Sequence, residues 1–194
     1  MTEQLSSIEQ VRQVLERFQD YYTHRDPTLL EDFLELLAGD DLEVIGTNGI
    51  RPRQGEWYLG QAAARELFLG DWQSWGDLRL DVPEARIHVL GQVAWLSTTA
   101  TVAMTIPADQ NIPDYLAFVR KYLDTDGPSA EEKLLYILRG GNNTLFELRR
   151  GERFTWPLRF TAVLIRQEAG WKFHQIQFSY PTIYFPDIRI FDGI

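Results

Sequence analysis

Apolar residues in the first part of the chain recur with the period of an α-helix. Between residues 7 and 23 they follow one another at intervals of three, three, one, three, three and one. The positions are Ile8, Val11, Val14, Leu15, Phe18, Tyr21 and Tyr22. This spacing places them on one face and predicts an amphipathic helix over residues 7–23. The pattern resumes after Asp26-Pro27 and predicts a second helix up to Gly39, with the proline in its first turn.

Shorter elements are expected next. An apolar stretch at residues 42–46 predicts a strand, and Asn48-Gly49 after it is a tight-turn sequence. Residues 57–60 form a short returning segment in this interpretation. A third helix is expected over residues 61–68, and the glycine-bounded stretch 70–76 is interpreted as a loop.

The remaining pattern is mostly that of strands. Leu78, Leu80 and Val82 alternate, and the apolar phase then shifts at Pro83-Glu84, which suggests a bulge or a sheet edge. A long strand is predicted over residues 93–106. Two more strands, over residues 160–167 and 171–180, are separated by a Glu-Ala-Gly turn and predict a hairpin.

An insertion of about residues 107–157 separates the long strand from this hairpin. It holds one helical pattern that ends near Leu123 and a second that starts at Ser129, where Glu132 completes a capping box, and ends at Gly140-Gly141. After Pro181 an apolar tail occupies residues 181–194. Helices grouped before an antiparallel sheet predict an α+β fold. We expect one domain over residues 1–194, with the insertion inside it.

Composition narrows the function classes. The formal net charge is −9, and an acidic surface disfavours nucleic-acid and membrane partners. The chain has no cysteine, so it offers no disulfide, thiolate nucleophile or thiolate metal ligand. No histidine or carboxylate spacing resembles a metal site, and no cofactor is expected. Without an apolar leader or a run of about 20 apolar residues, we expect a cytoplasmic protein.

The segment RFTAVLIRQEAGWKFHQIQFS, residues 159–179, resembles the last hairpin of SnoaL-like proteins and of the calcium/calmodulin-dependent kinase association domain. Both belong to the nuclear transport factor 2-like superfamily. The matching positions are Arg159, Thr161, Trp171 and Ser179, while Gln175 and Gln177 stand at two positions where that pattern has histidines. The resemblance covers about residues 7–104 and 158–181. It implies a cone in which N-terminal helices pack on a strongly curved mixed or antiparallel sheet.

Residues 14–50 are also similar to the start of ketosteroid isomerases, which share this fold. That resemblance puts Gly46 at the position of the aspartate base, Phe18 at that of the tyrosine and Thr161 at that of the second acid. None of the three side chains has the chemistry of the residue it replaces. Isomerisation by that mechanism is therefore not expected.

Candidate ligand-binding residues follow from strand alternation together with the resemblance. Alternation puts Trp171, Phe173, Gln175, Gln177 and Ser179 on one face, and the resemblance implies that this face lines the pocket. The candidate ligand-binding set is Gln175, Gln177, Ser179, Arg159, Thr161 and Trp57. The alternative for the glutamines is a solvated sheet face, and the alternative for Trp57 is core or loop packing.

Candidate catalytic residues are Tyr21, Tyr22, Asp41 and Arg159. A tyrosine at the end of the first helix can place its hydroxyl in the pocket, or can simply pack in the core. Asp41 can act in acid–base chemistry, or can merely begin a strand. Arg159 suits a carboxylate ligand through paired hydrogen bonds, or pairs with an acidic side chain at the rim.

Two functions stay open at this point. The first is binding of a small hydrophobic or carboxylate-bearing ligand in the cone, with or without isomerase- or cyclase-type activity. The second is a non-catalytic association module. A homodimer is expected in either case, because the superfamily dimerises through its convex sheet face. The insertion is expected to form a lid over the pocket or a dimer surface, since large apolar patches are rarely left exposed.

Overall fold

A computed structural model describes residues 6–105, 111–147 and 153–180. These residues divide into two compact units: the first comprises those within 1–102 and 156–194, and the second those within 103–155. The first unit contains three α-helices, α1 (Ser7–His24), α2 (Leu30–Leu34) and α3 (Gln61–Ser74). Its strands are β1 (Glu43–Ile45), β2 (Trp57–Leu59), β3 (Asp77–Leu80), β4 (Arg86–Leu90), β5 (Val93–Thr105), β6 (Arg153–Gln167) and β7 (Gly170–Ser179). The apolar tail, residues 181–194, lies outside the described residues.

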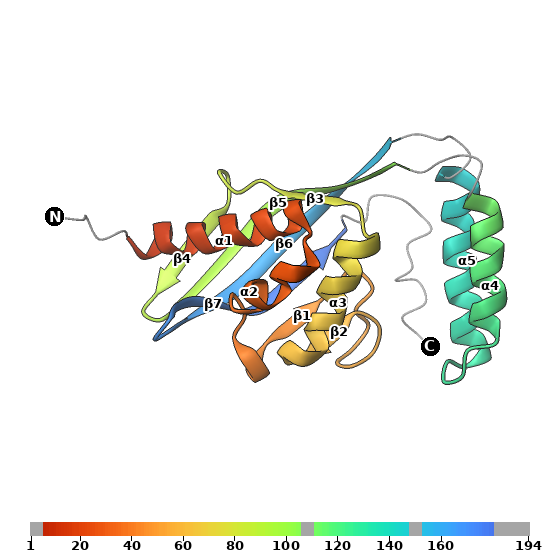
Figure 1. Ribbon diagram of the computed structural model, residues 1–194, viewed down its shortest axis with the longest axis horizontal. Coiled ribbons are helices and arrows are strands. Elements are labelled where there is room, and N and C mark those ends of the chain that lie inside the picture. The colour runs from red at the N-terminus through yellow and green to blue at the C-terminus, as the bar shows by residue number, and fades with distance from the viewer. Residues whose placement is uncertain (1–5, 106–110, 148–152, 181–194) are drawn as a thin grey trace. The chain divides into compact units, whose positions relative to one another are not determined.

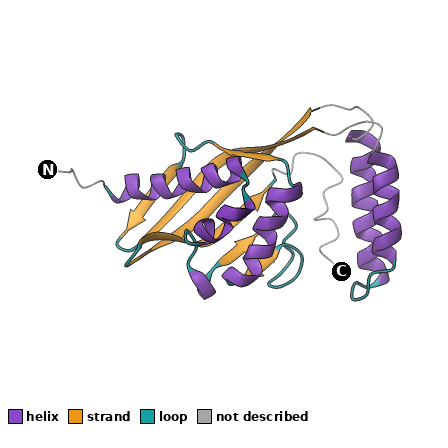
Figure 2. Cartoon of the chain, viewed as in Figure 1, coloured by secondary structure: helices purple, strands orange, loops and turns teal. Residues whose placement is uncertain are grey.

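The strands form one mixed, curved sheet. Its order is β2-β1-β7-β6-β5-β3, with β4 paired to β5. β1 runs parallel to β7, whereas the β6–β7, β4–β5 and β1–β2 pairs are antiparallel. Helices α1, α2 and α3 lie against one face of this sheet, which we call the helix-covered face (Figures 1 and 2). The α+β prediction and the predicted β6–β7 hairpin are confirmed.

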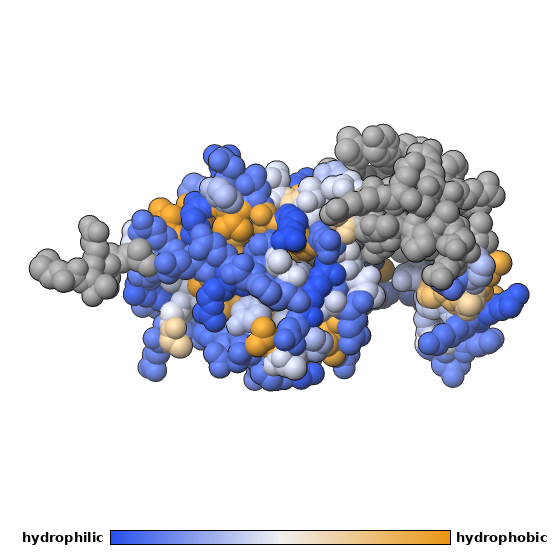
Figure 3. Space-filling view, turned by 45° about the horizontal axis from the view of Figure 1, so that its top comes forward, coloured by the Kyte–Doolittle hydropathy of each residue, from blue (hydrophilic) through white to orange (hydrophobic). Residues whose placement is uncertain are grey.

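The first helix forms as its apolar period predicts. Ser6 accepts a hydrogen bond from the backbone N–H of Glu9, and the Glu9 side chain accepts from that of Ser6, so that a capping box begins the helix. One stripe of α1 is buried, while the side of the molecule turned forward in Figure 3 is mostly hydrophilic, with small separate apolar patches. Burial of this stripe against the sheet fixes how α1 crosses the helix-covered face.

Aromatic rings fill the space between the helices and the sheet. Phe18 is fully buried, and its ring centroid lies 5.0–6.4 Å from the centroids of five other rings. These rings are Tyr22, Phe33, Phe68, Phe160 and Phe173. Each is buried, so these rings fill the depth of the cone between the helices and the sheet.

Two boundary predictions were wrong. The stretch 70–76 was expected to be a loop, but α3 continues through Ser74 because Phe68 and Trp72, one helical turn apart, are both buried on its inner face. The second helix was expected to continue to Gly39, but α2 ends at Leu34. The expectation of a sheet edge near Pro83-Glu84 agrees with the strand order, in which β3 is last and β4, which begins at Arg86, also pairs with β5.

The second unit is a pair of helices, α4 (Asn111–Leu123) and α5 (Ala130–Glu147). The capping box is present, since the backbone N–H of Ser129 donates to Glu132 and that of Glu132 donates to Ser129. The predicted end at Gly140-Gly141 was wrong. α5 continues because a Cβ on Gly141 would lie 3.1 Å from the Tyr115 hydroxyl, so that glycine provides close helix contact rather than a helix end. The expectation of a lid or a dimer surface stays a prediction.

Candidate functional site

The strand β7 contains a β-bulge that decides which residues face the core. Leu164 of β6 pairs with Phe173 and the preceding residue, Val163, pairs with Gln175, so that His174 is an extra residue in β7. Phe173, Ile176 and Phe178 all point to the helix-covered face and are buried. Gln175 and Gln177 therefore point to the opposite side, the outer face of the sheet, and Gln177 is exposed.

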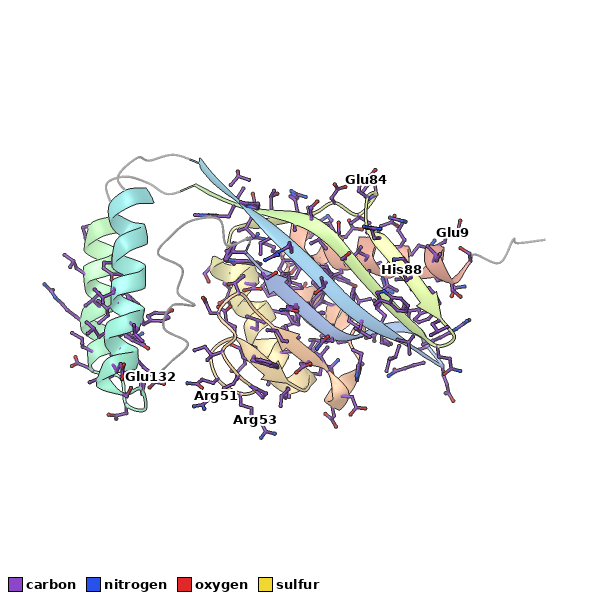
Figure 4. All side chains as sticks on the ribbon, turned by 180° about the vertical axis from the view of Figure 1, so that it is seen from behind. Glu9, Arg51, Arg53, Glu84, His88 and Glu132 are labelled. Carbon is purple, nitrogen blue, oxygen red and sulfur yellow. The ribbon has the colours of Figure 1, made fainter. Side chains whose placement is uncertain are left out.

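The predicted alternation of β7 was accordingly wrong beyond Phe173. Cross-strand pairing carries Arg159, Thr161 and Ser179 to the outer face as well, since Thr161 is opposite Gln177 and Arg159 is opposite Ser179. Arg159 and Thr161 are exposed, and Arg159 donates to the carbonyl of Tyr180 at 2.9 Å. Figure 4 shows the molecule from behind, with this outer face toward the viewer. His88 lies on β4, and no helix of the same unit covers the strands.

An open hollow of about 510 Å³ on the outer face brings two of the sequence candidates together. Asp41 and Gln175 both line it. Glu43, also in its lining, accepts hydrogen bonds from Gln175 Nε2 at 2.5 Å and from Trp57 Nε1 at 2.7 Å. The remaining lining residues are Asp40, Leu42, Arg53, Leu59, Val163 and His174. Trp57 thus holds a carboxylate of this hollow rather than lying inside the cone.

A second, smaller cavity of about 40 Å³ lies on the helix-covered face, at the edge of the aromatic core. Its lining residues come from the chain after β1, from α3 and from β7. They are Gly46, Thr47, Glu56, Leu67, Asp71, Trp75 and Phe178. The Trp75 and Phe178 rings meet edge to face, with centroids 5.7 Å apart. The cavity therefore combines an apolar wall with two carboxyl groups, and we call it the cone-edge cavity.

Asp71 is the group with the most altered acidity at this cavity. Burial raises its pKa to about 7, and the nearby Glu56 charge adds to the rise, while the Tyr22 hydrogen bond and Arg25 oppose it. The Tyr22 hydroxyl donates to Asp71 Oδ2 at 2.8 Å. Burial, followed by the charge of Asp71, keeps the pKa of Tyr22 well above its usual value, so Tyr22 stays a donor. Asp71 can take up or release a proton near neutral pH.

Glu56 is held in place by the loop that carries it. Its carboxylate accepts from the Asn48 backbone N–H at 2.9 Å and from Asn48 Nδ2 at 3.0 Å, and the Thr47 hydroxyl donates to it at 3.3 Å. A Cβ on Gly46 would lie 2.5 Å from Glu56 Oε2. The absence of a side chain at Gly46, which the resemblance to ketosteroid isomerases placed at the base position, thus makes room for the carboxylate of Glu56.

The two tyrosine candidates have different surroundings. Tyr22 reaches the cone-edge cavity through Asp71, whereas the Tyr21 ring packs against Phe33 and Trp72, with centroids 5.6 and 6.4 Å apart, respectively. Sequence reasoning missed Glu56 and Asp71. Asp71 follows Leu67 and Phe68 by four and three residues, so a helix continued through Trp72 would have placed a carboxyl group beside buried apolar positions. Such a group is rarely buried without a partner.

The described residues contain neither a metal-ligand cluster nor a membrane-spanning helix. Across residues 6–105, 111–147 and 153–180, no three His, Asp or Glu side chains are grouped closely enough to hold a metal ion. Within the same ranges, no helix has the length and apolar character that crossing a membrane requires.

Comparisons with known proteins identify the fold. No protein-family model and no curated protein matches this sequence. A nuclear transport factor 2-like superfamily protein from Salmonella enterica is similar in structure, with a TM-score of 0.56 and 14% identity over 93% of this chain and 96% of that one. A ketosteroid isomerase-like protein from Erwinia carotovora has a TM-score of 0.53 and 13% identity, over 94% of this chain and 99% of that one. An NTF2-like protein with a cystatin-like fold from Novosphingobium aromaticivorans has a TM-score of 0.54 and 13% identity, over 91% of this chain and 83% of that one.

Proposed function

We propose that this chain, which has the NTF2-like cone fold, binds a small, uncharged, largely apolar molecule at the cone-edge cavity and that Asp71 exchanges a proton with it. The observation that carries the proposal is the hydrogen-bonded pair of Tyr22 and Asp71 at a cavity with an apolar wall. A carboxyl group with a pKa of about 7 is half protonated at neutral pH, which suits a general acid or base.

The charges at the cavity limit the class of ligand. Glu56 and Asp71 both line it, so a carboxylate-bearing ligand would meet two acidic groups. This disfavours the anionic ligand class that Arg159 suggested, since Arg159 lies on the outer face. Leu67, Trp75 and Phe178 favour an apolar ring or chain with one hydroxyl or carbonyl group directed at Asp71.

The size of the cavity implies a movement on binding. A volume of about 40 Å³ holds water but not an organic ring. Glu56 is hydrogen-bonded to Thr47 and Asn48 of its own loop, so the loop can move as one piece without breaking those bonds. In this proposal a ligand displaces the loop outward and takes the space beside Trp75.

Fluorescence of Trp75 tests the proposal. We expect saturable quenching when small cyclic enones or phenols are added, and loss of that response in the Trp75→Phe variant. Asp71→Asn should weaken binding at least severalfold, whereas Asp77→Asn, which removes an exposed carboxyl group near the same helix end, should leave it unchanged. If no compound quenches the wild-type protein and none shifts its melting temperature, the ligand proposal is wrong.

Self-association through the outer face is a second candidate function. Leu90, Val93 and Trp95 on the β4–β5 hairpin are 74%, 42% and 45% exposed, and the His88 ring stacks on Trp95 with centroids 5.4 Å apart. Apolar side chains in such numbers on one hairpin favour an interface between two copies. We expect a dimer in sedimentation at micromolar concentration and a monomer for Trp95→Lys. A wild-type monomer at that concentration would rule this function out.

A further inference from the structure

Arg25 lies between the carboxyl-terminal ends of two helices. It is the C-cap of α1, with a left-handed backbone (φ 50°), and its backbone N–H donates to the Tyr21 carbonyl at 2.8 Å. Its side chain reaches from there to the end of α3. Nε donates to the carbonyl of Tyr22 at 3.1 Å, Nη1 to that of Trp75 at 2.8 Å, and Nη2 to that of Gly76.

This arrangement satisfies groups that helix ends leave without partners. The last carbonyls of a helix have no intrahelical donor and carry the negative end of its dipole. The guanidinium meets one such carbonyl in the last turn of α1, that of Tyr22, and the carbonyls of Trp75, the C-cap of α3, and of Gly76 after it. Its planar fork has enough donors for all three. Its side chain is 19% exposed, and Asp77 lies 3.5 Å from Nη2. The two helix ends are therefore joined through one side chain.

The same two helix ends carry the Tyr22–Asp71 pair. Tyr22 precedes Arg25 by three residues, and its own carbonyl is one of the three acceptors. Asp71 precedes Trp75 by four residues, and the Trp75 backbone N–H donates to the Asp71 carbonyl at 3.0 Å. The guanidinium is thus hydrogen-bonded to the backbone of Tyr22 itself and to that of Trp75, one helical turn beyond Asp71. A change in the separation of the helix ends changes the separation of the two side chains.

We propose that Arg25 is the positioning residue of the Tyr22–Asp71 pair and that its fork, rather than its charge alone, holds the Tyr22 hydroxyl on Asp71. The inference rests on the proposed function, because the pair matters for activity only if Asp71 exchanges a proton. The groups that act electrostatically on or with Asp71 are Tyr22 and Arg25 from α1 and its cap, Glu56 from the loop, and Tyr58 from β2.

A double-mutant cycle on the free protein tests the proposal without any ligand. The pKa of Asp71 is measured by carbon NMR of its side-chain carboxyl group. Tyr22→Phe removes a hydrogen bond to the carboxylate and should raise this pKa. Arg25→Lys keeps the positive charge but loses the fork. It should raise the pKa by about 0.5 to 1 unit, and it should add almost nothing in the Tyr22→Phe background.

Two control variants separate positioning from a general effect of charge. Arg79→Lys changes an exposed arginine of β3 that donates to Thr23 of α1, the helix that carries Tyr22. It should leave the pKa of Asp71 unchanged. Asp77→Asn weakens the ion pair with Arg25 at an exposed carboxyl group and should have little effect on the pKa of Asp71. Melting curves check that each variant is folded.

The inference is overturned if Arg25→Lys leaves the pKa of Asp71 at its wild-type value, or if its effect adds in full to that of Tyr22→Phe. The outcome is independent of the ligand test. Quenching of Trp75 without this pKa pattern rejects only the role of Arg25. The pKa pattern without any ligand response rejects only the proposed function.

Discussion

The two faces of the sheet differ in how much a single side chain contributes to the stability of the fold. On the helix-covered face, successive strands supply fully buried rings, and the polar pair Tyr22 and Asp71 is hydrogen-bonded within this packing. On the outer face, Thr161 and Gln177 stand opposite each other and are exposed. Substitution on the first face changes packing or leaves a buried polar group without its partner, whereas substitution of an exposed residue such as Gln177 on the second face should change folding stability little.

The largest expected effect comes from removing the central ring of the helix-covered face. Phe18→Ala deletes a side chain that contacts five other rings and should lower the free energy of unfolding by about 3–5 kcal/mol. Gln177→Ala, its counterpart on the outer face, should change that free energy by less than about 0.5 kcal/mol. Urea denaturation followed by circular dichroism measures both. Equal effects would remove the distinction between the faces.

The half-buried carboxyl group of Asp71 should make the stability of the helix-covered face depend on pH. The pKa of Asp71 is raised from 3.8 to about 7, so the folded protein binds its proton more tightly than the unfolded chain does. Below about pH 4, the raised pKa of Asp71 does not change the free energy of unfolding. As the pH rises to 7, it lowers the free energy of unfolding progressively, by on the order of 3–4 kcal/mol.

Asp71→Asn should remove this part of the pH dependence. Unfolding free energies measured between pH 4 and 8 would then fall less steeply in the variant than in the wild-type protein. Asp77→Asn is the matched control, since Asp77 is exposed. Identical curves for wild type and Asp71→Asn would show that Asp71 is not protonated at neutral pH.

The bulge in β7 can be tested by deleting single residues. Without His174 the strand keeps Phe173, Ile176 and Phe178 on the helix-covered face, so we expect a loss of no more than about 1–2 kcal/mol. Without Ile176 the ladder moves Gln175 into a buried position opposite Ala162, and we expect a loss of at least about 2 kcal/mol. Melting temperatures compare the two deletions. A His174 deletion as damaging as the other would contradict this register.

The sequence predicted more of the fold than of the site, for physical reasons visible in β7. Burial sets the period of helices and strands, so α1, the β6–β7 hairpin and the α+β class could be predicted from spacing alone. The spacing of apolar residues also indicates the bulge in β7. Trp171, Phe173, Ile176 and Phe178 are separated by two, three and two residues, a phase shift like the one noted near Pro83. Strict alternation ignores this shift, so it puts Gln175 and Gln177 on the wrong face.

The members of the site could not be predicted in the same way. Tyr22 and Asp71 are far apart in the sequence, and they lie 2.8 Å apart because the carboxyl-terminal ends of α1 and α3 come together. Glu56 depends on a glycine at residue 46 to make room for it. Contacts between elements of this kind follow from packing rather than from local pattern, so a single sequence carries little information about them.

The smallest expected effect refines the outer face itself. Gln175 donates to Glu43 at 2.5 Å, whereas Gln177 lies two residues further along the same face and is exposed. Gln175→Ala should lower the free energy of unfolding by about 0.5–1 kcal/mol, because Trp57 still donates to Glu43 when the glutamine is gone. Urea denaturation should distinguish it from Gln177→Ala. If the two alanine variants are equally stable, the contact between Gln175 and Glu43 adds nothing to the stability of the fold, and both glutamines behave as solvated side chains.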